Sequence, residues 1–227
     1  MTEVPLRGGR ITPGVVRVGE TVRRPTGANS TFVHELLLHL ERVGFGGVPR
    51  FLGIDAQGRE ILSYVEGSVP RDLCRDYPDE VLVAAARLLR AYHDAAACSD
   101  LAGDAETVCH NDISPVNAVF VDGLPVALID FDAAVPGPRM RDLAYGLFLW
   151  LDLTDDGLPL PEQARRTRVF FAAYGMPGPP AGLVDEILAR QRERAPTAPG
   201  GPGAIRWWNG QADWLEQNRA AYEEALM

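Results

Sequence analysis

"CHNDISPVNAVFVDGLPVALIDFD", residues Cys109–Asp132, combines two apolar runs with a concentration of polar side chains. The runs "NAVFV" and "PVALI" are typical of β-strands, and the Asp122-Gly123 pair between them predicts a hairpin turn. If the runs pair as adjacent strands, Asn117 opens the first and Asp130 closes the second. Their side chains then reach the same edge of the hairpin, next to a turn that Ser-Pro imposes after Asp112.

This edge of the hairpin suits phosphoryl transfer, a reaction that needs little covalent work from the protein. It requires magnesium to neutralise phosphate charge and a group that orients the attacking hydroxyl. Magnesium prefers oxygen ligands and is held by one or two protein groups, while water and phosphate oxygens complete its shell. Asn117 and Asp130 could supply those ligands, and Asp112 would remain free to accept the proton of an acceptor hydroxyl.

"HNDISPVN", followed by "LIDFD", resembles the catalytic segment of the aminoglycoside phosphotransferase and choline kinase family, which shares the protein-kinase-like fold. The resemblance implies that Asp112 is the catalytic base and that His110 belongs to the catalytic loop as its structural brace. It also implies that Asn117 and Asp130 bind Mg²⁺. "PGPRMRDLAYGLFLW" is similar to the family's next segment, in which a pair such as Arg141-Asp142 anchors a helix against the catalytic loop.

The first third of the chain alternates short β-rich runs with turns. One hairpin is predicted over residues 14–24 and a second over residues 50–67. Between them, "TFVHELLLHLERV" (residues 31–43) has the periodicity of an amphipathic helix. Its apolar stripe would consist of Phe32, Leu36, Leu40 and Val43. The sequence therefore predicts a small sheet plus one helix.

Beyond a hinge near residues 66–71 the pattern becomes mostly helical. Helices are predicted at 79–97, from about 141, and at 162–174, 183–194 and 211–226, with the Pro/Gly-rich 195–203 as a mobile loop. We therefore expect a two-lobed, protein-kinase-like α+β fold. Residues 1–67 would form a short antiparallel-sheet lobe that binds nucleotide, and residues 68–227 a mainly helical lobe for catalysis and substrate.

The nucleotide-binding features of the first lobe depart from the family. Related kinases hold the α and β phosphates with a strand lysine paired to a helix glutamate, but this chain contains no lysine. In "TVRR", Val22 and Arg24 share a face of the predicted strand, which would direct Val22 to the adenine and Arg24 to the phosphates. Arginine binds phosphate bidentately, so the exchange is chemically credible. The helix partner of Arg24 would be either Glu35 or His34, and a merely solvated Arg24 is the alternative.

Two further contacts with nucleotide are expected from the family architecture. The adenine would lie against the hinge backbone at residues 63–66, which makes Val65 and Glu66 candidate nucleotide-binding residues. Gly8-Gly9 could form a tight turn whose amides approach phosphate, although a plain N-terminal turn explains the pair equally well.

Charge is distributed unevenly along the chain. Residues 1–67 carry eight arginines and seven acids, whereas residues 68–227 carry fourteen arginines and twenty-four acids, a balance of −10. This field disfavours nucleic acid as a partner and could attract a cationic small molecule, with solubility as the alternative reason. The longest apolar segment, residues 143–151, is too short to span a bilayer, so we expect a cytoplasmic protein without a membrane partner. The three cysteines show neither zinc-site nor disulfide spacing and should be reduced.

These patterns together predict a small-molecule kinase that uses Mg²⁺ and ATP or GTP. Its acceptor would be a hydroxyl compound such as an aminoglycoside or another amine-bearing alcohol. Two alternatives are a catalytically inactive kinase-like binding or regulatory protein, and nucleotidyl transfer on the same fold. Trp207, Trp208 and Trp214 either line the acceptor cleft or pack the last helix. The acceptor, the choice between ATP and GTP, and the oligomeric state are not determined by the sequence.

Overall fold

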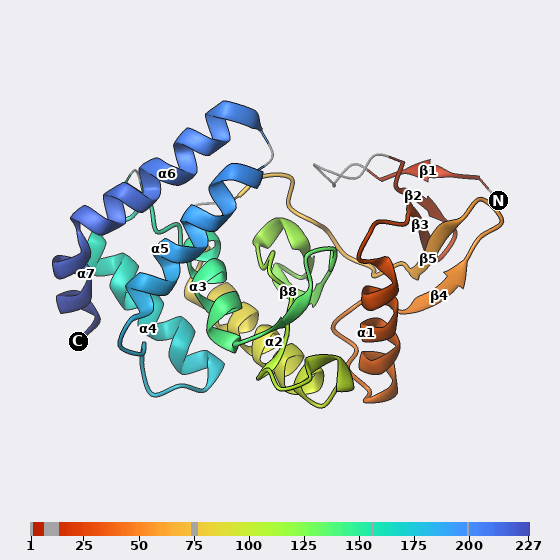
Figure 1. Cartoon of the computed structure of the whole chain (residues 1–227), viewed down its shortest axis with the longest axis horizontal. Coiled ribbons are helices and arrows are strands. Elements are labelled where there is room, and N and C mark those ends of the chain that lie inside the picture. The colour runs from red at the N-terminus through yellow and green to blue at the C-terminus, as the bar shows by residue number, and fades with distance from the viewer. Residues whose placement is uncertain (1, 7–13, 74–76, 156, 199) are drawn as a thin grey trace.

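The computed structural model describes residues 2–6, 14–73, 77–155, 157–198 and 200–227, and it places an antiparallel sheet beside a mainly helical part (Figure 1). Five short strands form the sheet in the order β1-β2-β3-β5-β4, and each pairs antiparallel with its neighbours. The strands are β1 Val4–Pro5, β2 Val16–Val18, β3 Thr21–Pro25, β4 Phe51–Ile54 and β5 Arg59–Ser63. The two predicted hairpins, β2–β3 and β4–β5, are confirmed.

The rest of the chain carries most of the helices and two small strand pairs. The helices are α1 Ser30–Arg42, α2 Asp79–Ala97, α3 Arg139–Trp150, α4 Leu160–Tyr174, α5 Leu183–Arg194, α6 Gly201–Gln217 and α7 Arg219–Leu226. The 3-10 turns are η1 Asp100–Ala102, η2 Pro115–Asn117 and η3 Ala195–Thr197. The strand pairs join β6 Thr107–Cys109 to β9 Val135–Gly137, and β7 Ala118–Val121 to β8 Leu124–Leu128. The predicted α+β fold is confirmed.

Helix α1 buries a slightly different stripe from the one predicted. Leu36 and Leu40 are buried as expected, and the helix also buries Val33 and Leu37. Val43 is 46% exposed, because α1 ends at Arg42 and Val43 is only its C-terminal cap. The assignment of Val43 to the buried stripe was therefore wrong, because the helix ends one residue before it.

Helix α2 lies at the centre of the helical part, where it packs against both α4 and β8. Acidic residues in its first turn suit the positive end of the helix dipole. Five side chains at helical spacing on one face of α2 are all buried: Leu82, Ala85, Ala86, Leu89 and His93. The helical period therefore located this face correctly.

The C-terminal end differs from the prediction of a long loop followed by one helix. Helix α6 already begins at Gly201, with Pro202 in its first turn, where a missing backbone N–H costs nothing. The helical conformation is then interrupted at Asn218, which separates α6 from α7. On α6, Trp208 is buried and packs against Phe148 with ring centroids 4.9 Å apart. The Pro/Gly-rich stretch is thus partly a helix start.

The segment that joins the sheet to the helical part is fixed against β7. The backbone N–H of Ser68 donates to the carbonyl of Phe120 at 2.9 Å, and the N–H of Phe120 donates back at 2.7 Å. Gly67 beside it has φ +143°, and a Cβ there would lie 2.6 Å from the Phe120 carbonyl oxygen. Only glycine fits this close approach. The connection therefore holds the sheet close to the β7–β8 hairpin.

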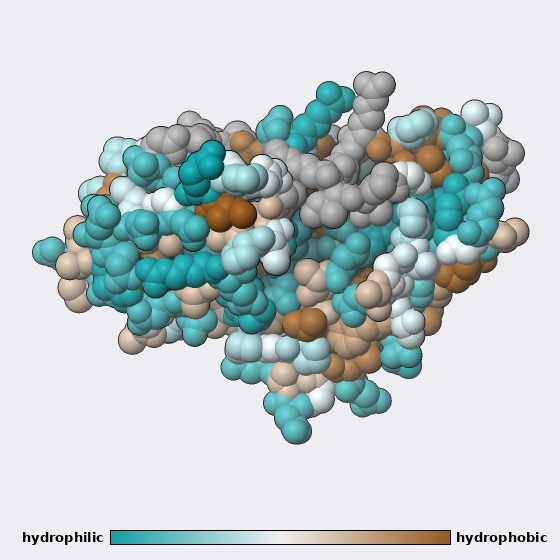
Figure 2. All heavy atoms as spheres, turned by 45° about the horizontal axis from the view of Figure 1, so that its top comes forward, coloured by the Kyte–Doolittle hydropathy of each residue, from teal (hydrophilic) through white to brown (hydrophobic). Residues whose placement is uncertain are grey.

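The surface gives less information about function than the interior. Figure 2 shows hydrophilic residues over most of one face, with apolar groups scattered among them. Scattered apolar side chains are normal on a protein surface and need no partner to explain them. In the described part of the chain, no helix has both the length and the apolar character that crossing a membrane requires.

Candidate active site

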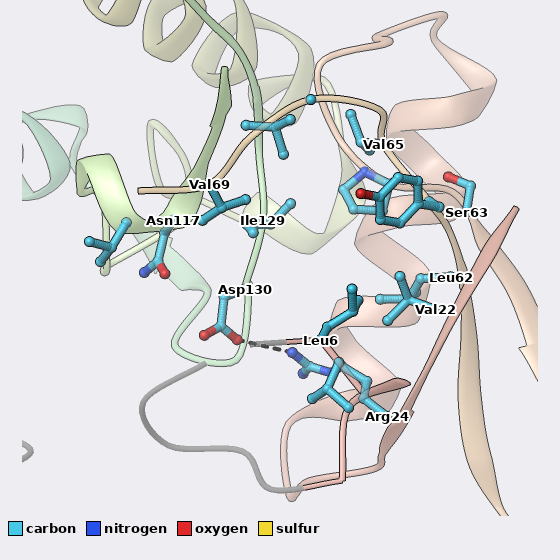
Figure 3. A pocket seen from close by; sticks show the side chains of 16 residues that line it. Leu6, Val22, Arg24, Leu62, Ser63, Val65, Val69, Asn117, Ile129 and Asp130 are labelled. Carbon is cyan, nitrogen blue, oxygen red and sulfur yellow. Dashed lines mark hydrogen bonds and ion pairs between the residues drawn. The ribbon is translucent and has the colours of Figure 1, made fainter. Parts of the chain in front are cut away.

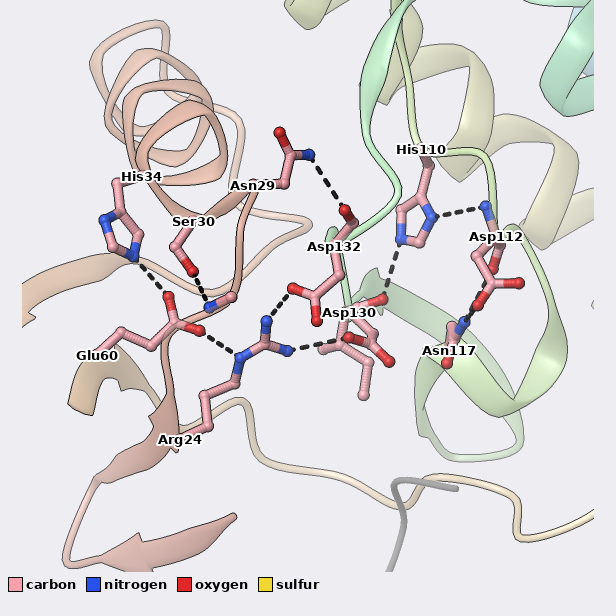
Figure 4. Close-up of polar contacts among 12 residues, drawn as sticks. Arg24, Asn29, Ser30, His34, Glu60, His110, Asp112, Asn117, Asp130 and Asp132 are labelled. Carbon is pink, nitrogen blue, oxygen red and sulfur yellow. Dashed lines mark hydrogen bonds and ion pairs between the residues drawn. The ribbon is translucent and has the colours of Figure 1, made fainter. Parts of the chain in front are cut away.

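Asp112, Asn117 and Asp130 meet at the open end of the β7–β8 hairpin. In this hairpin Ala118 pairs with Leu128, so the residues just before β7 lie beside those just after β8. The Nδ2 atom of Asn117 donates to both the Oδ2 and the backbone oxygen of Asp112, each at 2.9 Å (Figure 4). The structure therefore brings the three predicted side chains to one edge, and these bonds leave the amide oxygen of Asn117 available to a ligand.

His110 and Asp142 brace the loop that carries Asp112. His110 is fully buried, and its Nε2 donates to the carbonyl of Ile129 at 3.0 Å while its Nδ1 accepts from the N–H of Asp112 at 3.3 Å. The buried carboxylate of Asp142 accepts from the backbone N–H groups of His110 and Asn111, each at 2.7 Å. Asp142 thus anchors α3 to the loop, as the resemblance implied for the Arg141-Asp142 pair.

Two residues at this edge adopt a backbone conformation that side chains disfavour. Asn111 has φ +63° and Asp130 has φ +67°, both in the left-handed region. Asn and Asp tolerate this region better than other residues, but it still has an energetic cost that surrounding contacts must offset. The bonds from Asp142 to the loop and from Arg24 to Asp130 supply such contacts. Strain of this kind is common where side chains are aimed at a ligand.

A cavity of about 320 Å³ lies between the sheet and the β7–β8 hairpin (Figure 3). Arg24, Asn117 and Asp130 supply charged and polar side chains to its wall. The apolar wall includes Val15, Val22, Leu62, Val65, Val69, Val116, Val119 and Ile129. A pocket of a few hundred Å³ with an apolar wall and a few convergent polar groups is typical of a small-molecule site. Val22 and Arg24 line the same pocket, as strand alternation predicts.

Arg24 is the centre of a buried charge cluster rather than a solvated strand residue (Figure 4). Its side chain forms ion pairs with Glu60, Asp130 and Asp132, and the contact with Asp130 Oδ1 measures 3.0 Å. Burial by itself would lower the pKa of Arg24, but Asp132, Glu60 and Asp130 outweigh it and raise the pKa above the usual value. The guanidinium therefore stays charged and is shared between the sheet and the hairpin.

The partner of Arg24 is neither Glu35 nor His34, the two helix residues that the sequence left as alternatives. Glu60 on the neighbouring strand β5 receives the Arg24 Nε, because the antiparallel register places these residues opposite each other. The other oxygen of Glu60 lies 2.6 Å from Nε2 of His34 on α1. Glu35 is exposed on the outer face of α1. A strand glutamate thus bridges the arginine to the helix.

The remaining predicted nucleotide contacts are placed as follows. Val65 lines the cavity together with Ser63 and Tyr64. Glu66 does not belong to the cavity wall, and its side chain forms a 2.8 Å ion pair with Arg17 at the surface. Gly8-Gly9 lies outside the described residues.

The donor set at the hairpin edge fits magnesium. Asp130 offers a carboxylate and Asn117 an amide oxygen to the same cavity, which matches the preference of Mg²⁺ for a few protein oxygens completed by phosphate and water. Within the described ranges, no group of three or more His, Cys, Asp or Glu side chains is placed to hold a metal by itself. The site therefore suits a metal ion that binds together with phosphate, and Asn117 and Asp130 would hold that ion.

Sequence reasoning missed four side chains at this site: Glu60, Asp132, Tyr145 and Arg194. The carboxylate of Asp132 pairs with Arg24. Tyr145 donates to Asp112 Oδ1 at 2.6 Å, and Nη2 of Arg194 lies 3.6 Å from the same oxygen. Tyr145 lies on α3 and Arg194 on α5, so the local motif around Asp112 gives no indication of either residue. Only Glu60 had a usable signal, a charge opposite Arg24, and reading it requires the strand pairing.

Known proteins resemble this chain in sequence or in fold. Residues 95–183 match the family described as "Phosphotransferase enzyme family". The Trifolitoxin immunity protein of Rhizobium leguminosarum bv. trifolii is 30% identical over 255 aligned residues, which cover 96% of each chain. A thermostable mutant of aminoglycoside phosphotransferase APH(4)-Ia in its apo form superposes with a TM-score of 0.62 at 16% identity, over 97% of this chain and 95% of that one. The GDP complex of wild-type aminoglycoside 2'-phosphotransferase-IIIa gives a TM-score of 0.60 at 14% identity, over 96% and 93%. At these identities the solved structures show similarity of fold alone.

Proposed function

Since this chain belongs to the phosphotransferase enzyme family, as its motif predicted, we propose that it is a metal-dependent kinase acting on a small molecule. It would move the γ-phosphate of ATP or GTP to a hydroxyl group. One observation carries the proposal: Arg24, Asn117 and Asp130 line a single cavity, and Asn117 is hydrogen-bonded to Asp112 at its edge. A binding protein without phosphate chemistry would have no evident use for this convergence of charge.

The described residues divide the work between the two lobes. Residues 1–67 would bind the nucleotide, with Val22 and Val65 against the base and Arg24 on the phosphates. Residues 68–227 would supply the catalytic loop and the acceptor site. Glu66 would contribute through its backbone, because its side chain is engaged with Arg17. A reaction that consumes nucleoside triphosphate is expected in the cytoplasm.

Asp112 would orient the acceptor hydroxyl and accept its proton as the oxygen attacks the γ-phosphorus. The bond from the γ-phosphorus to the bridging oxygen breaks, and the nucleoside diphosphate leaves. Mg²⁺ held by Asn117 and Asp130 would neutralise the phosphate charge. Arg24 would hold the phosphates in line, and His110 would act as a positioning residue, because it bonds the loop and not the cavity.

The test is phosphate transfer from labelled ATP or GTP, with magnesium, to a panel of aminoglycosides, amino-alcohols and hydroxy acids. Asp112→Asn should lower the turnover rate roughly 100-fold or more, as loss of a general base does. Asp130→Ala should abolish magnesium-dependent nucleotide binding. Asp122→Asn is the matched control, because Asp122 lies in the exposed turn of the same hairpin. A wild-type chain that neither binds nucleotide nor differs from these variants contradicts the proposal.

A second candidate function follows from the 30% identity to an immunity protein across nearly the whole chain. The chain would protect its host from a toxin, either by phosphorylating the toxin or by binding it without transfer. Expression in a sensitive strain tests this candidate, with the Asp112→Asn variant alongside. Protection that survives the variant indicates binding alone, protection that is lost with it indicates phosphorylation, and no protection by wild type contradicts the candidate.

A further inference from the structure

The side chains around the Asp112 carboxylate are unusual for a site that would receive a polyamine. Asp112 is contacted by Tyr145 of α3 at 2.6 Å and faced by Arg194 of α5 at 3.6 Å. In Figure 1 the C-terminal end of α5, where Arg194 lies, is directed toward the middle of the molecule. The catalytic base is therefore approached by a cation of the chain itself, from the helical side opposite the nucleotide cavity.

Arg194 is only partly committed to its contacts. Its side chain is 24% exposed, and among the described residues its buried Nε has no hydrogen-bond partner. The 3.6 Å separation from Asp112 is longer than a direct hydrogen bond, so the two groups attract without being fully paired. An arginine presents five N–H donors, so beyond its interactions with Asp112 and Tyr145 this one could still donate to an incoming anion.

Further arginines reinforce the positive character of this wall. Arg190, one turn earlier on α5, is 7% exposed, and its Nε is also buried without a partner among the described residues. Its guanidinium donates to Glu193, which also receives Arg141 at 2.8 Å. Burial together with the nearby Arg141 lowers the pKa of Arg190, since like charges disfavour each other. Arg141, Arg190 and Arg194 thus face three carboxylates, those of Glu193, Asp112 and Asp142, and they concentrate arginine beside Asp112 in a lobe that is acidic as a whole.

We infer that Arg194 is a specificity-determining residue that binds an anionic group on the acceptor, so that the acceptor is a hydroxyl compound carrying a carboxylate or a phosphate ester. This inference rests on the proposed kinase function and names its substrate class. It replaces the expectation of a cationic acceptor, which came from the net charge of the whole lobe. A polyamine would bring positive charge against Arg194 and lose its own hydration there.

The reaction remains the transfer described above. The acceptor oxygen forms a bond to the γ-phosphorus, the bond to the β–γ bridging oxygen breaks, and the hydroxyl proton passes to Asp112. The nucleoside diphosphate keeps the electron pair of the broken bond. The anionic group of the acceptor takes no part in these steps. This group takes the place of Asp112 as the partner of Arg194, so the Asp112 carboxylate is free to face the acceptor hydroxyl.

The test compares matched acceptors that differ only in charge. N-acetyl-L-serine is set against N-acetyl-L-serinamide, glycerol 3-phosphate against glycerol, and kanamycin and choline are the cationic probes. Dissociation constants are measured by calorimetric titration, with magnesium, in the presence and absence of a non-hydrolysable ATP analogue. We expect at least one anion to bind about tenfold or more tightly than its neutral counterpart, as a charged hydrogen bond provides. The two anionic arms distinguish a carboxylate site from a phosphate site.

Three variants assign the preference to Arg194. Arg194→Gln should abolish the preference for the anion, and Arg194→Lys should retain part of it. Arg192→Gln is the matched control, because Arg192 lies on the same helix with a 55% exposed side chain paired to Glu216. All three variants should bind the ATP analogue as wild type does, and thermal unfolding checks that they are folded.

Several results would overturn the inference. They are equal binding of both members of each pair, tighter binding of kanamycin or choline than of either anion, and an anion preference that survives Arg194→Gln. Failure of the ATP analogue to bind is a different result, because it contradicts the proposed function. The anion preference is measured without the analogue as well, so the two failures are distinguishable.

Discussion

His34 of α1 lies 2.6 Å from Glu60 of β5, and the second oxygen of the same carboxylate accepts a hydrogen bond from Arg24. Glu60 is only 1% exposed, so this carboxylate is buried between Arg24 and His34. The ring of His34 also stacks on Phe51 at 3.8 Å, which holds it in place. The orientation of Arg24 therefore depends on a strand residue, Glu60, which His34 of α1 contacts in turn.

Glu60→Gln should weaken nucleotide binding more than it lowers the turnover rate. The amide cannot neutralise Arg24, which would then be held by the hairpin carboxylates alone and drawn away from the phosphates. We expect the KM for nucleotide to rise about tenfold, the equivalent of roughly 1.4 kcal/mol. Glu35→Gln on the exposed face of α1 is the matched control and should behave as wild type. An unchanged KM in Glu60→Gln would show that Arg24 is oriented by other contacts.

Arg24→Gln should alter the response of the protein to magnesium. The substitution leaves Asp130 and Asp132 without their internal cation, and Glu60 without its strand partner. We expect a lower melting temperature, a loss of nucleotide affinity, and a larger stabilisation by magnesium alone than in wild type, since a ligand that binds the folded state raises its stability. Thermal unfolding with and without magnesium measures the melting temperature and the stabilisation by magnesium. Titrating nucleotide into the same assay measures the loss of nucleotide affinity. Equal magnesium shifts in both proteins would refute the idea that Arg24 neutralises the carboxylates.

Tyr145→Phe should reduce the turnover rate while nucleotide binding stays unchanged. It removes the 2.6 Å hydrogen bond to Asp112 and keeps the ring that stacks on Trp208 with centroids 5.9 Å apart. Burial and the nearby Asp112 carboxylate raise the pKa of Tyr145. The phenol therefore stays neutral and donates a hydrogen bond to Asp112. A decrease of about tenfold is expected, the equivalent of about 1.4 kcal/mol. Tyr222→Phe, which loses a 2.7 Å contact to Thr167 far from the loop, is the control.

Asp142 should make stability depend on pH in the acid range. Burial works to raise the pKa of Asp142, but bonds from His93 and the His110 backbone outweigh it, so the pKa lies below 3.8. The unfolded chain then takes up the proton first, and the stabilisation is present above pH 3.8 and lost as the pH falls through the folded value. Asp142→Asn should cost on the order of 1–3 kcal/mol at neutral pH, because buried donors lose their acceptor. In urea unfolding, the difference between the free energies of unfolding of wild type and Asp142→Asn should shrink below about pH 4. A difference that stays constant with pH would argue against this role of Asp142.

The β7–β8 hairpin could be predicted because its determinants are local. Turn residues, two apolar runs and the positions of Asn117 and Asp130 are all contained in one short stretch, and strand pairing does the rest. Helix α2 was equally accessible, since its buried face follows from helical period alone. Where local chemistry and burial agree, the sequence determines both the element and the face it presents.

Contacts between distant elements could not be predicted in this way. The pairing of β3 with β5 skips a strand and a helix, so no spacing in the sequence indicates that Glu60 faces Arg24. Arg194 lies more than eighty residues from Asp112 in the sequence and reaches it only because α5 packs on α3. Net charge describes the lobe as a whole, so it gives no indication that Arg194 lies beside Asp112. The start of α6 was missed because Pro and Gly, which suggest a loop, also fit a helix start.

The buried guanidinium of Arg24 has a practical consequence for chemical labelling. Nucleotide probes that acylate the phosphate-binding amine of kinases will find no acceptor in this chain, because it contains no lysine. Inhibitors that acylate a lysine, and regulation by lysine acetylation, have no target in this sequence for the same reason. Dicarbonyl reagents that modify arginine are the appropriate covalent reporters, and nucleotide should protect Arg24 from them.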